Sequence, residues 1–144
     1  MVKLNQSDLD EINKTFNKLS NIDKSPILAE FADYVYQRAH KRADAHTKTG
    51  AMIKALFITR KADTYTIGVD TRFVPYALFV HWGTKKHEIK PKKRQYLRWS
   101  SGGKFVFSKE VHHPGYKGDT FLTLALDDGL KKLPHFFERL IKDL

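Results

Sequence analysis

Apolar residues recur at helical spacing near the start of the chain. One face of a first helix would carry Leu9, Ile12, Phe16 and Leu19. Ser7 is suited to cap this helix, with acidic residues close to its positively polarised N-terminal end. The segment "NIDKSP" breaks the pattern, and Ser25 followed by Pro26 predicts a new helix that starts with a cap residue and a proline. We expect that helix to continue to about His46, with an apolar face formed by Ile27, Leu28, Phe31, Val35 and Ala39.

From position 51 the pattern becomes that of strands. The segments "AMIKALFITR" and "TYTIGVD" alternate and are rich in β-branched and aromatic residues, and "KAD" between them predicts the turn of a hairpin. In "PYALFVHWG" the spacing fits a short helix that begins at proline and has glycine at its C-terminal cap. A strand is the alternative, because every second residue of this stretch is also apolar.

The second half of the chain combines short strands with a final helix. Strands are predicted at "HEIK", "QYLRW" and "GKFVFS", with a turn at Gly102-Gly103 and a turn or loop at "HHPGYKGD". From about Thr120 the pattern is helical again, and we expect Gly129 and Pro134 to interrupt it, with a kink or restart at the proline.

These elements predict an α+β fold in which a long N-terminal helix and a C-terminal helix pack on a small, mainly antiparallel β-sheet. At 144 residues the chain is expected to form a single domain. Its predicted parts are an N-terminal helical extension (residues 1–24), a core (residues 25–126) and a C-terminal helical segment (residues 127–144).

The net charge of +10 is concentrated in one segment of the chain. Between Lys85 and Lys117 there are ten Lys and Arg residues against two Glu residues, whereas the rest of the chain holds sixteen basic and fourteen acidic residues. Such a segment attracts either phosphate backbones or an acidic protein surface, and charge alone does not decide between them.

The composition excludes several classes of protein. There are no cysteines, which rules out disulfides and thiolate metal sites. The polar, acidic start of the chain lacks the pattern of a signal peptide, and no apolar run approaches the roughly 20 residues that a membrane span needs. We therefore expect a soluble protein that is made and used inside a cell, or inside a particle that a cell assembles.

The residues that suggest metal binding or catalysis lack the spacing that either would need. The histidines that raise a metal hypothesis are His81, His87, His112 and His113. They form no pattern such as HExxH, and adjacent histidines on a strand point to opposite faces. The pairs Ser100-Ser101 and Ser108-Lys109 lie in neither a GxSxG nor an SxxK pattern. Asp127-Asp128 is expected on the solvated face of the last helix, and no enzyme activity, cofactor or metal is predicted.

The segment "KPKKRQYLRW" gives the best case for nucleic-acid contact. Its lysines can pair with phosphates while Tyr96 or Trp99 stacks on bases. Strand alternation places Tyr96 and Arg98 on one face and Leu97 and Trp99 on the other, which favours a core position for Trp99. A solvated basic face, or one that meets an acidic subunit, is the simpler alternative because no RRM, KH or helix-turn-helix signature accompanies the charge.

Five short motifs follow one another between Lys48 and Leu126. They are "KTGAMIKAL", "VPYALFVHWGTKKHEIKPKK", "YLRW", "GGKFVFSKEVHHPGYKG" and "FLTLAL". Their most specific residues are Tyr76, Ala77, Gly83, Thr84, Ile89, Pro91, His113, Pro114, Gly115 and Phe121. In this order and at these distances the motifs resemble the small neck and head–tail joining proteins of long-tailed bacteriophages, a group that includes tail-completion and minor tail proteins.

The resemblance implies a helix packed on a small β-sheet, in a structural virion protein without catalytic residues or cofactors. Such proteins act as rings of subunits, commonly six-fold at the tail end of the neck, around the channel that DNA crosses. The implied partners are further copies in a hexameric ring, other neck proteins (adaptor, stopper or tail terminator), the tail tube and DNA in the lumen, with no membrane. The implied location is the head–tail interface of a virion assembled in the host bacterial cytoplasm.

Two positions depart from the family pattern. His81 stands where the family carries an acidic residue two positions before the Gly-Thr pair, and Asp119-Thr120 stands where a proline would precede Phe121. The contact that the acidic residue makes in relatives is therefore not expected in this chain.

Within such a ring, we expect the residues from Tyr76 to Val80 to anchor in the core and Gly83 to adopt positive φ. The segment from Thr84 to Arg94 would project as a basic loop toward a neighbouring subunit, an adjoining ring or DNA, while His113-Pro114-Gly115 sets a turn. The candidate contact residues are Lys85, Lys86, Lys90, Lys92, Lys93 and Arg94. The alternative function is that of a basic nucleic-acid-binding protein that is not built into the particle.

Overall fold

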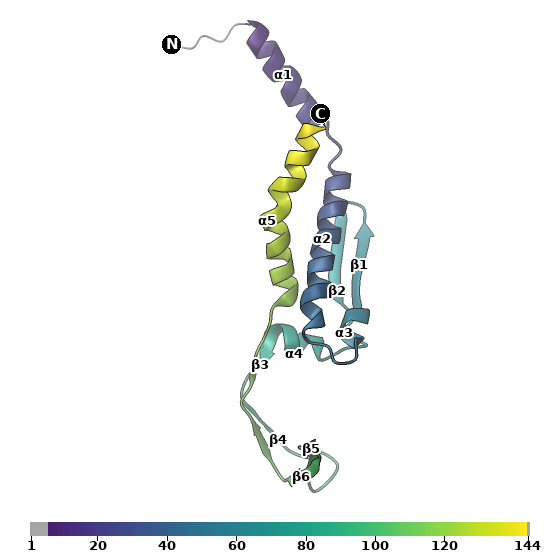
Figure 1. Ribbon diagram of the computed structural model, residues 1–144, viewed down its shortest axis with the longest axis vertical. Coiled ribbons are helices and arrows are strands. Elements are labelled where there is room, and N and C mark those ends of the chain that lie inside the picture. Colours follow the sequence, from purple (N-terminus) through teal and green to yellow (C-terminus); the bar gives the residue numbers. More distant parts are fainter. Residues whose placement is uncertain (1–5, 144) are drawn as a thin grey trace, which may run out of the picture.

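The chain is elongated, with two narrow elements that leave a helical body at opposite ends (Figure 1). The computed structural model describes residues 6–143. Helix α1 (Gln6–Ser20) extends from one end of the body, and the segment from Gly83 to Gly118, here called the arm, extends from the other. The first five residues and Leu144, which belong to the predicted terminal segments, lie outside the described residues.

The body is built around two antiparallel helices and a β-hairpin. α2 (Ser25–Asp44) and α5 (Phe121–Lys142) lie side by side and run in opposite directions (Figure 1). The hairpin of β1 (Leu56–Lys61) and β2 (Thr64–Val69) packs against α2. All six residues of β1 are paired with β2, from Leu56 opposite Val69 to Lys61 opposite Thr64.

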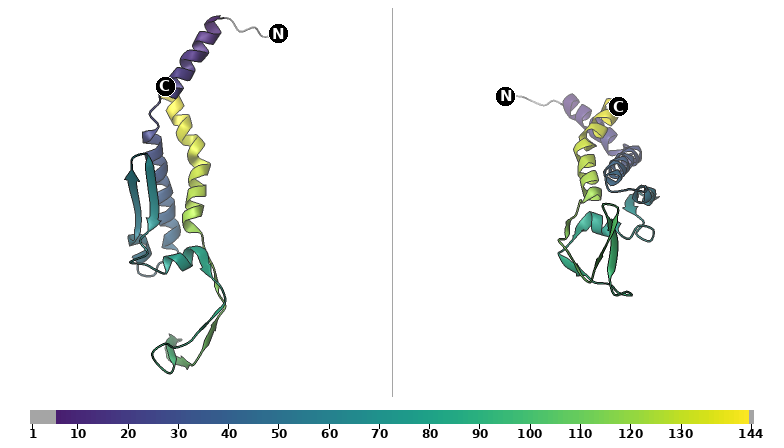
Figure 2. Two further views of the ribbon diagram at one scale, coloured as in Figure 1. Left: turned by 180° about the vertical axis from the view of Figure 1, so that it is seen from behind. Right: turned by 60° about the horizontal axis from the view of Figure 1, so that its bottom comes forward.

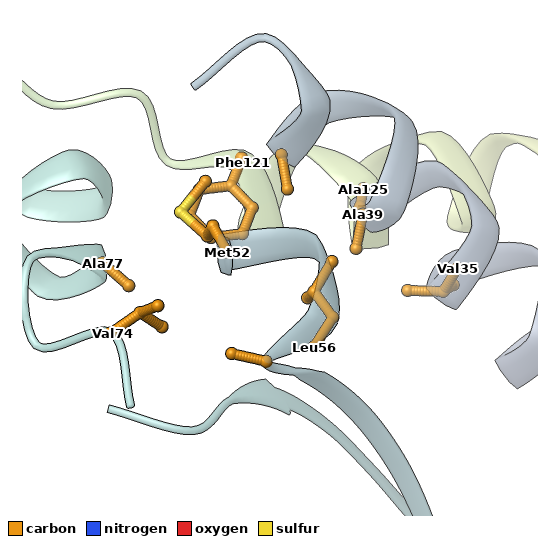
Figure 3. Packing of buried hydrophobic residues seen from close by; sticks show 10 residues of the cluster. Val35, Ala39, Met52, Leu56, Val74, Ala77, Phe121 and Ala125 are labelled. Carbon is orange, nitrogen blue, oxygen red and sulfur yellow. The ribbon is translucent and has the colours of Figure 1, made fainter. Parts of the chain in front are cut away.

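The core lies at the end of the body from which the arm leaves, where α3 (Ala51–Lys54) and α4 (Ala77–Trp82) meet the long helices (Figures 1 and 3). Its largest fully buried side chains are Phe121, Met52 and Val74. Burying a side chain of this kind stabilises a fold by about 1.5–3 kcal/mol. The other buried members of the cluster are Val35, Ala39, Ala43, Ala55, Leu56, Ala77 and Ala125.

The predicted α+β class is confirmed, as are the hairpin and the short helix in "PYALFVHWG". The antiparallel strands form four two-stranded ladders instead of one sheet. Residues 51–54, predicted to belong to the first strand, form α3 instead, because Met52 turns into the core there. The hairpin turn consists of Ala62 and Asp63 alone.

The predicted helix starts need correction by one residue or more. α1 begins at Gln6, so Ser7 lies inside the helix instead of capping it. Ser25 is the first residue of α2, and the carboxylate of Asp23 accepts a hydrogen bond from its backbone N–H at 2.9 Å. α2 ends at Asp44, two residues before the predicted end. Among residues 6–143, none of the helices combines the length and hydropathy needed to cross a membrane.

α5 continues through both residues that were expected to interrupt it. Gly129 is buried against α2, where an added Cβ would lie 2.5 Å from Val35 Cγ2, so the glycine allows the two helices to approach. Beyond Pro134, the ring of Phe136 is buried edge-on to Phe31 at a centroid distance of 6.5 Å. This packing holds the last turns of the helix in place, so the prediction of a helix restart at Pro134 was wrong.

Asp128 also differs from its predicted position on a solvated face. Its Oδ2 accepts hydrogen bonds from Arg38 Nη2 at 2.8 Å and from Arg42 Nη2 at 2.9 Å, and its side chain is only 17% exposed. The two guanidinium groups hold the pKa of this carboxyl below its usual value, Arg38 having the larger effect. The neighbouring Asp127 is exposed, as predicted.

Candidate functional site: a basic arm with aromatic residues at its tip

The arm consists of two antiparallel segments of the chain that extend together from the body (Figures 1 and 2). Its three ladders are β3 (Gly83–Thr84) with β8 (Tyr116–Lys117), β4 (His87–Ile89) with β7 (Val111–His113), and β5 (Leu97–Ser101) with β6 (Lys104–Ser108). The predicted basic loop is therefore part of one side of the arm, and it contains β4.

The tip and the return strand agree only in part with the predictions. Gly102 and Gly103 form the predicted tight turn, with φ values of 56° and 77° that suit a two-residue hairpin. The segment "HHPGYKGD", predicted as a turn or loop, instead contains the end of β7 and all of β8. The turn is confined to Pro114 and Gly115, where the backbone N–H of Gly115 donates to His113 Nδ1 at 3.0 Å.

The root of the arm is held by close contact between glycine backbones. Gly83 has a φ of 81°, as predicted, and an added Cβ there would collide with the carbonyl oxygen of Tyr116. A Cβ on Gly115 would lie 2.7 Å from the carbonyl oxygen of Thr84. The motif residues Gly83, Thr84 and Gly115 therefore come together where the two strands of the arm leave the body.

A buried histidine lies beside this root. His81 is 8% exposed, and its ring is edge-on to Phe121 at a centroid distance of 5.3 Å and to Trp82 at 4.6 Å. Burial lowers the pKa of His81, an effect that the charge of Asp119 opposes. Its Nδ1 is buried without a hydrogen-bond partner. The neutral imidazole at this position acts as a core residue.

Asp119 connects the return strand of the arm to the turn that follows α2. Its backbone N–H donates to the carbonyl oxygen of Val80 at 2.9 Å, and its Oδ2 lies 2.6 Å from His46 Nε2. The backbone contact of Asp119 ties the start of α5 to α4.

The basic side chains of the arm are exposed along its length. Lys90 is paired, with Nζ 3.3 Å from Glu88 and 3.8 Å from Glu110, and the hydrogen bond to Glu88 contributes most to raising its pKa. The candidate contact residues that make no ion pair with any described residue are Lys85, Lys86, Lys92, Lys93 and Arg94. Five unpaired cations on one narrow element make it an attractive surface for a negatively charged partner.

A metal ion needs several ligands close together. Among residues 6–143, one group of at least three His, Asp or Glu side chains has its ligand atoms within 4.8 Å of one another, and it consists of Glu88, Glu110 and His112. The ammonium of Lys90 already lies between the two carboxylates, and the side chain of His112 is 78% exposed. The other three histidines of the metal hypothesis lie elsewhere, with His87 stacked on His113 at 4.9 Å and His81 in the core. The geometry therefore gives little support for a metal site.

The tip of the arm is apolar on both faces. Strand alternation and the β5–β6 register place Phe105 and Phe107 on one face with Arg98, and Trp99 opposite Val106 on the other. Phe105 is 63% exposed, Phe107 60% and Trp99 40%, so the prediction that Trp99 is a core residue was wrong. Neither phenylalanine was predicted to be a functional residue. Their signal was the unbroken apolar run "FVF", which puts apolar side chains on both sides of a strand.

A shallow apolar groove of about 900 Å³ follows the root of the arm along α4. The side chains that line it include Tyr76, Phe79, Val80, Ile89 and Tyr116. Tyr76 is 41% exposed and Phe79 57%, so only Ala77 of the predicted anchor is buried in the core and Val80 is half-buried. The expectation that the whole segment is anchored was wrong because α4 covers only the end of the body, which leaves its outer face uncovered.

The motif residues divide between the body and the arm. Ala77 and Phe121 are in the core, and Pro91 is half-buried, whereas Ile89 is 36% exposed on β4. Of the serines considered for catalysis, Ser108 donates its hydroxyl to the carbonyl oxygen of Glu110 at 2.5 Å, and Ser100 and Ser101 are exposed at the tip. The hydroxyl of Ser108 thus stabilises the local backbone between β6 and β7.

No family model, curated protein or solved structure matches this chain. The functional proposal therefore depends on the geometry of the arm and on the motifs gathered at its root.

Proposed function

We propose that this chain is a structural component of the neck of a long-tailed bacteriophage, where it completes the tail and joins it to the head. Copies assemble as a ring, a hexamer by the resemblance, around the channel that DNA crosses, at the head–tail interface of a particle assembled in the bacterial cytoplasm. The observation that carries the proposal is the arm, a projecting element whose apolar and basic side chains are largely uncovered in the single chain.

The two apolar faces of the tip support a role in assembly. A two-stranded hairpin alone is at best marginally stable in water. Covering Phe105 and Phe107 leaves Trp99 on the opposite face still exposed, so the tip needs contacts on two sides. A subunit that contacts two neighbours through two different surfaces makes heterologous contacts. Such contacts generate a ring when the rotation between subunits closes.

The unpaired cations support docking against a negatively charged surface. Complementary charge across an interface sets register and the rate of encounter more than it sets affinity. The surfaces that fit this role are an acidic face of an adjoining neck protein (adaptor, stopper or tail terminator), the tail tube, and the phosphates of DNA in the lumen. The glycine contacts at the root would hold the arm in a fixed direction toward that surface.

The test is a nonsense mutation in this gene in the phage that carries it, followed by electron microscopy of the lysate. We expect full heads and separate, complete tails. Normally joined particles would contradict the neck proposal. Supplying the wild-type chain from a plasmid should restore joining, which excludes a secondary mutation as the cause.

The arm is tested by complementation with a triple charge reversal, Lys92→Glu, Lys93→Glu and Arg94→Glu. All three side chains are exposed, so we expect a folded protein that fails to join heads to tails. The matched control reverses three exposed lysines of the body, Lys48→Glu, Lys54→Glu and Lys61→Glu, and should support joining. Joining by both variants would show that the basic arm is not the docking element.

One observation favours nucleic-acid binding as the alternative function. The guanidinium of Arg98 lies 4.4 Å from the ring centroid of Phe105, and Lys109 lies 5.8 Å from that of Tyr96. Exposed rings beside cations are typical of surfaces that bind single strands by stacking and phosphate pairing. Under this alternative, the affinity for DNA should fall steeply with salt, and the arm reversal should abolish DNA retention while heads and tails still join.

A further inference from the structure

α1 carries an apolar seam on its exposed surface. Leu9, Ile12, Phe16 and Leu19 recur at spacings of three, four and three residues, as the a and d positions of a coiled-coil heptad do. All four side chains are exposed, and Phe16 is 66% exposed. A helix of 15 residues is marginal in water without packing, so this seam needs a partner.

A groove of the same character lies on the body, along α2 between α5 and β2. Two adjoining cavities of about 390 and 550 Å³ share Leu28 and Phe31 and form this groove. The large apolar side chains that remain exposed along it are Leu28 (36%), Leu126 (43%), Leu130 (50%) and Phe137 (39%).

The groove is long enough to hold the whole seam. At a rise of 1.5 Å per residue, the seam from Leu9 to Leu19 spans about 15 Å. The stretch of α2 that lines the two cavities runs from Ser25 to Ala39 and spans about 21 Å by the same rule. An amphipathic helix that lays its apolar face in a hydrophobic groove is a recurrent mode of recognition.

We propose that α1 of one copy packs lengthwise in the α2–α5 groove of a second copy. The occupant is α1 of another copy because, in its own chain, α1 points away from the body (Figures 1 and 2). The connection between α1 and α2 is short, with Asn21 N–H bonded to the carbonyl of Asn17 and Asp23 bonded to Ser25. Its own groove therefore stays open to receive a neighbour's helix.

Each copy both gives a helix and receives one, so the contact is heterologous and links copies in series. The chain of contacts closes into a ring where the rotation between copies allows it. The arm takes no part in this contact. The inference therefore does not depend on the neck assignment, and it adds a second link between subunits that is separate from the arm.

The first test is sedimentation velocity of the full chain over a hundred-fold range of concentration. We expect concentration-dependent association, weakened at least ten-fold by Phe16→Asp on the seam and by Leu126→Asp in the groove. Both side chains are exposed in the single chain, so the Tm of the dilute protein should change little. Lys14→Asp, on the face of α1 opposite the seam, is the matched control and should associate as the wild type does.

A wild type that stays monomeric at all concentrations, or seam and groove variants that associate normally, would overturn the proposal.

Cross-linking then identifies which copy supplies the helix. The chain has no cysteines, so Thr15→Cys and Thr123→Cys can be placed in separate, differently tagged copies and joined by a flexible bismaleimide. We expect a mixed cross-linked dimer. A double-cysteine chain that links only within itself would show that α1 folds back on its own groove instead.

Discussion

Gly83 and Gly118 face each other at the root of the arm, so closely that a Cβ built on either would lie 2.5 Å from the amide nitrogen of the other. The two strands therefore leave the body in backbone contact, with no space for a side chain between them. Gly83 also has φ 81° and ψ −175°, a combination that is essentially restricted to glycine. The direction of the arm depends on these two residues.

Replacing Gly83 by alanine should loosen the root of the arm. We expect a loss of about 2–5 kcal/mol in the free energy of unfolding, because backbone strain and a steric collision add. Gly50→Ala is the matched control, since Gly50 has φ 74° but nothing within 4 Å of an added Cβ. That change should cost about 1–2 kcal/mol. Denaturant unfolding measures both, and equal losses would contradict the role given to the close contact.

The Asp128 carboxylate should contribute a pH-dependent part of the stability. Arg38, and to a lesser extent Arg42, lower the pKa of Asp128 in the folded protein below its ordinary value of 3.8. The stabilisation is therefore present above that pH and is lost as the pH falls through the lowered pKa. We expect Asp128→Asn to lower the Tm at pH 6 and to differ less from the wild type at pH 3.

The control for this prediction is Asp127→Asn at the adjacent, exposed position. That change should leave the Tm close to the wild-type value at both pH values. A Tm difference for Asp128→Asn that stays constant between pH 6 and pH 3 would show that its loss is steric and not due to the ion pairs.

The sequence predicted the helices and the hairpin because their signals are local. The apolar stripe of α2 and the Ser-Pro start depend on residues within a few positions of one another. The helix restart at Pro134 and the solvated position of Asp128 were predicted wrongly, because residues far away in the sequence determine the surroundings of both. Phe136 packs on Phe31, about a hundred positions earlier in the chain, and this contact keeps the helix intact beyond the proline.

Only some features of the arm could be predicted from the sequence. The composition predicted its basic character, and a motif predicted the positive φ of Gly83. The pairing of Gly83 with Lys117 joins the two ends of the arm, so no local sequence pattern indicates it. Trp99 was placed in the core because alternation shows only that a strand has an apolar face. It does not show whether the same chain supplies the surface that covers that face.

His81 should make the protein less stable as the pH falls below neutrality. Burial lowers the pKa of His81 in the folded protein below its ordinary value of 6.5, so the unfolded chain binds a proton first. Its contribution to stability is therefore complete above pH 6.5 and is lost below it. We expect His81→Phe, which keeps an aromatic ring beside Trp82 and Phe121, to show a smaller fall in Tm from pH 7.5 to pH 5.5 than the wild type.

His135→Phe is the control for a histidine outside the core, since His135 is exposed on α5. It should keep the pH dependence of the wild type. A pH dependence in His81→Phe equal to that of the wild type would mean that the buried ring does not cause the effect.

Polar replacement of the tip aromatics should separate folding from assembly. Phe105 and Phe107 are about 60% exposed and lie outside the core cluster, so Phe105→Ser with Phe107→Ser should leave the Tm of the free protein almost unchanged. Both side chains lie on one face of the tip, and we expect the double variant to fail in joining heads to tails because a neighbour no longer covers that face. Ser100→Ala on the same face is the control and should join normally. Normal joining by the double variant would contradict contacts on both faces of the tip, and Trp99→Ser then tests whether the opposite face alone is used. If that variant also joins normally, the tip is not part of the interface.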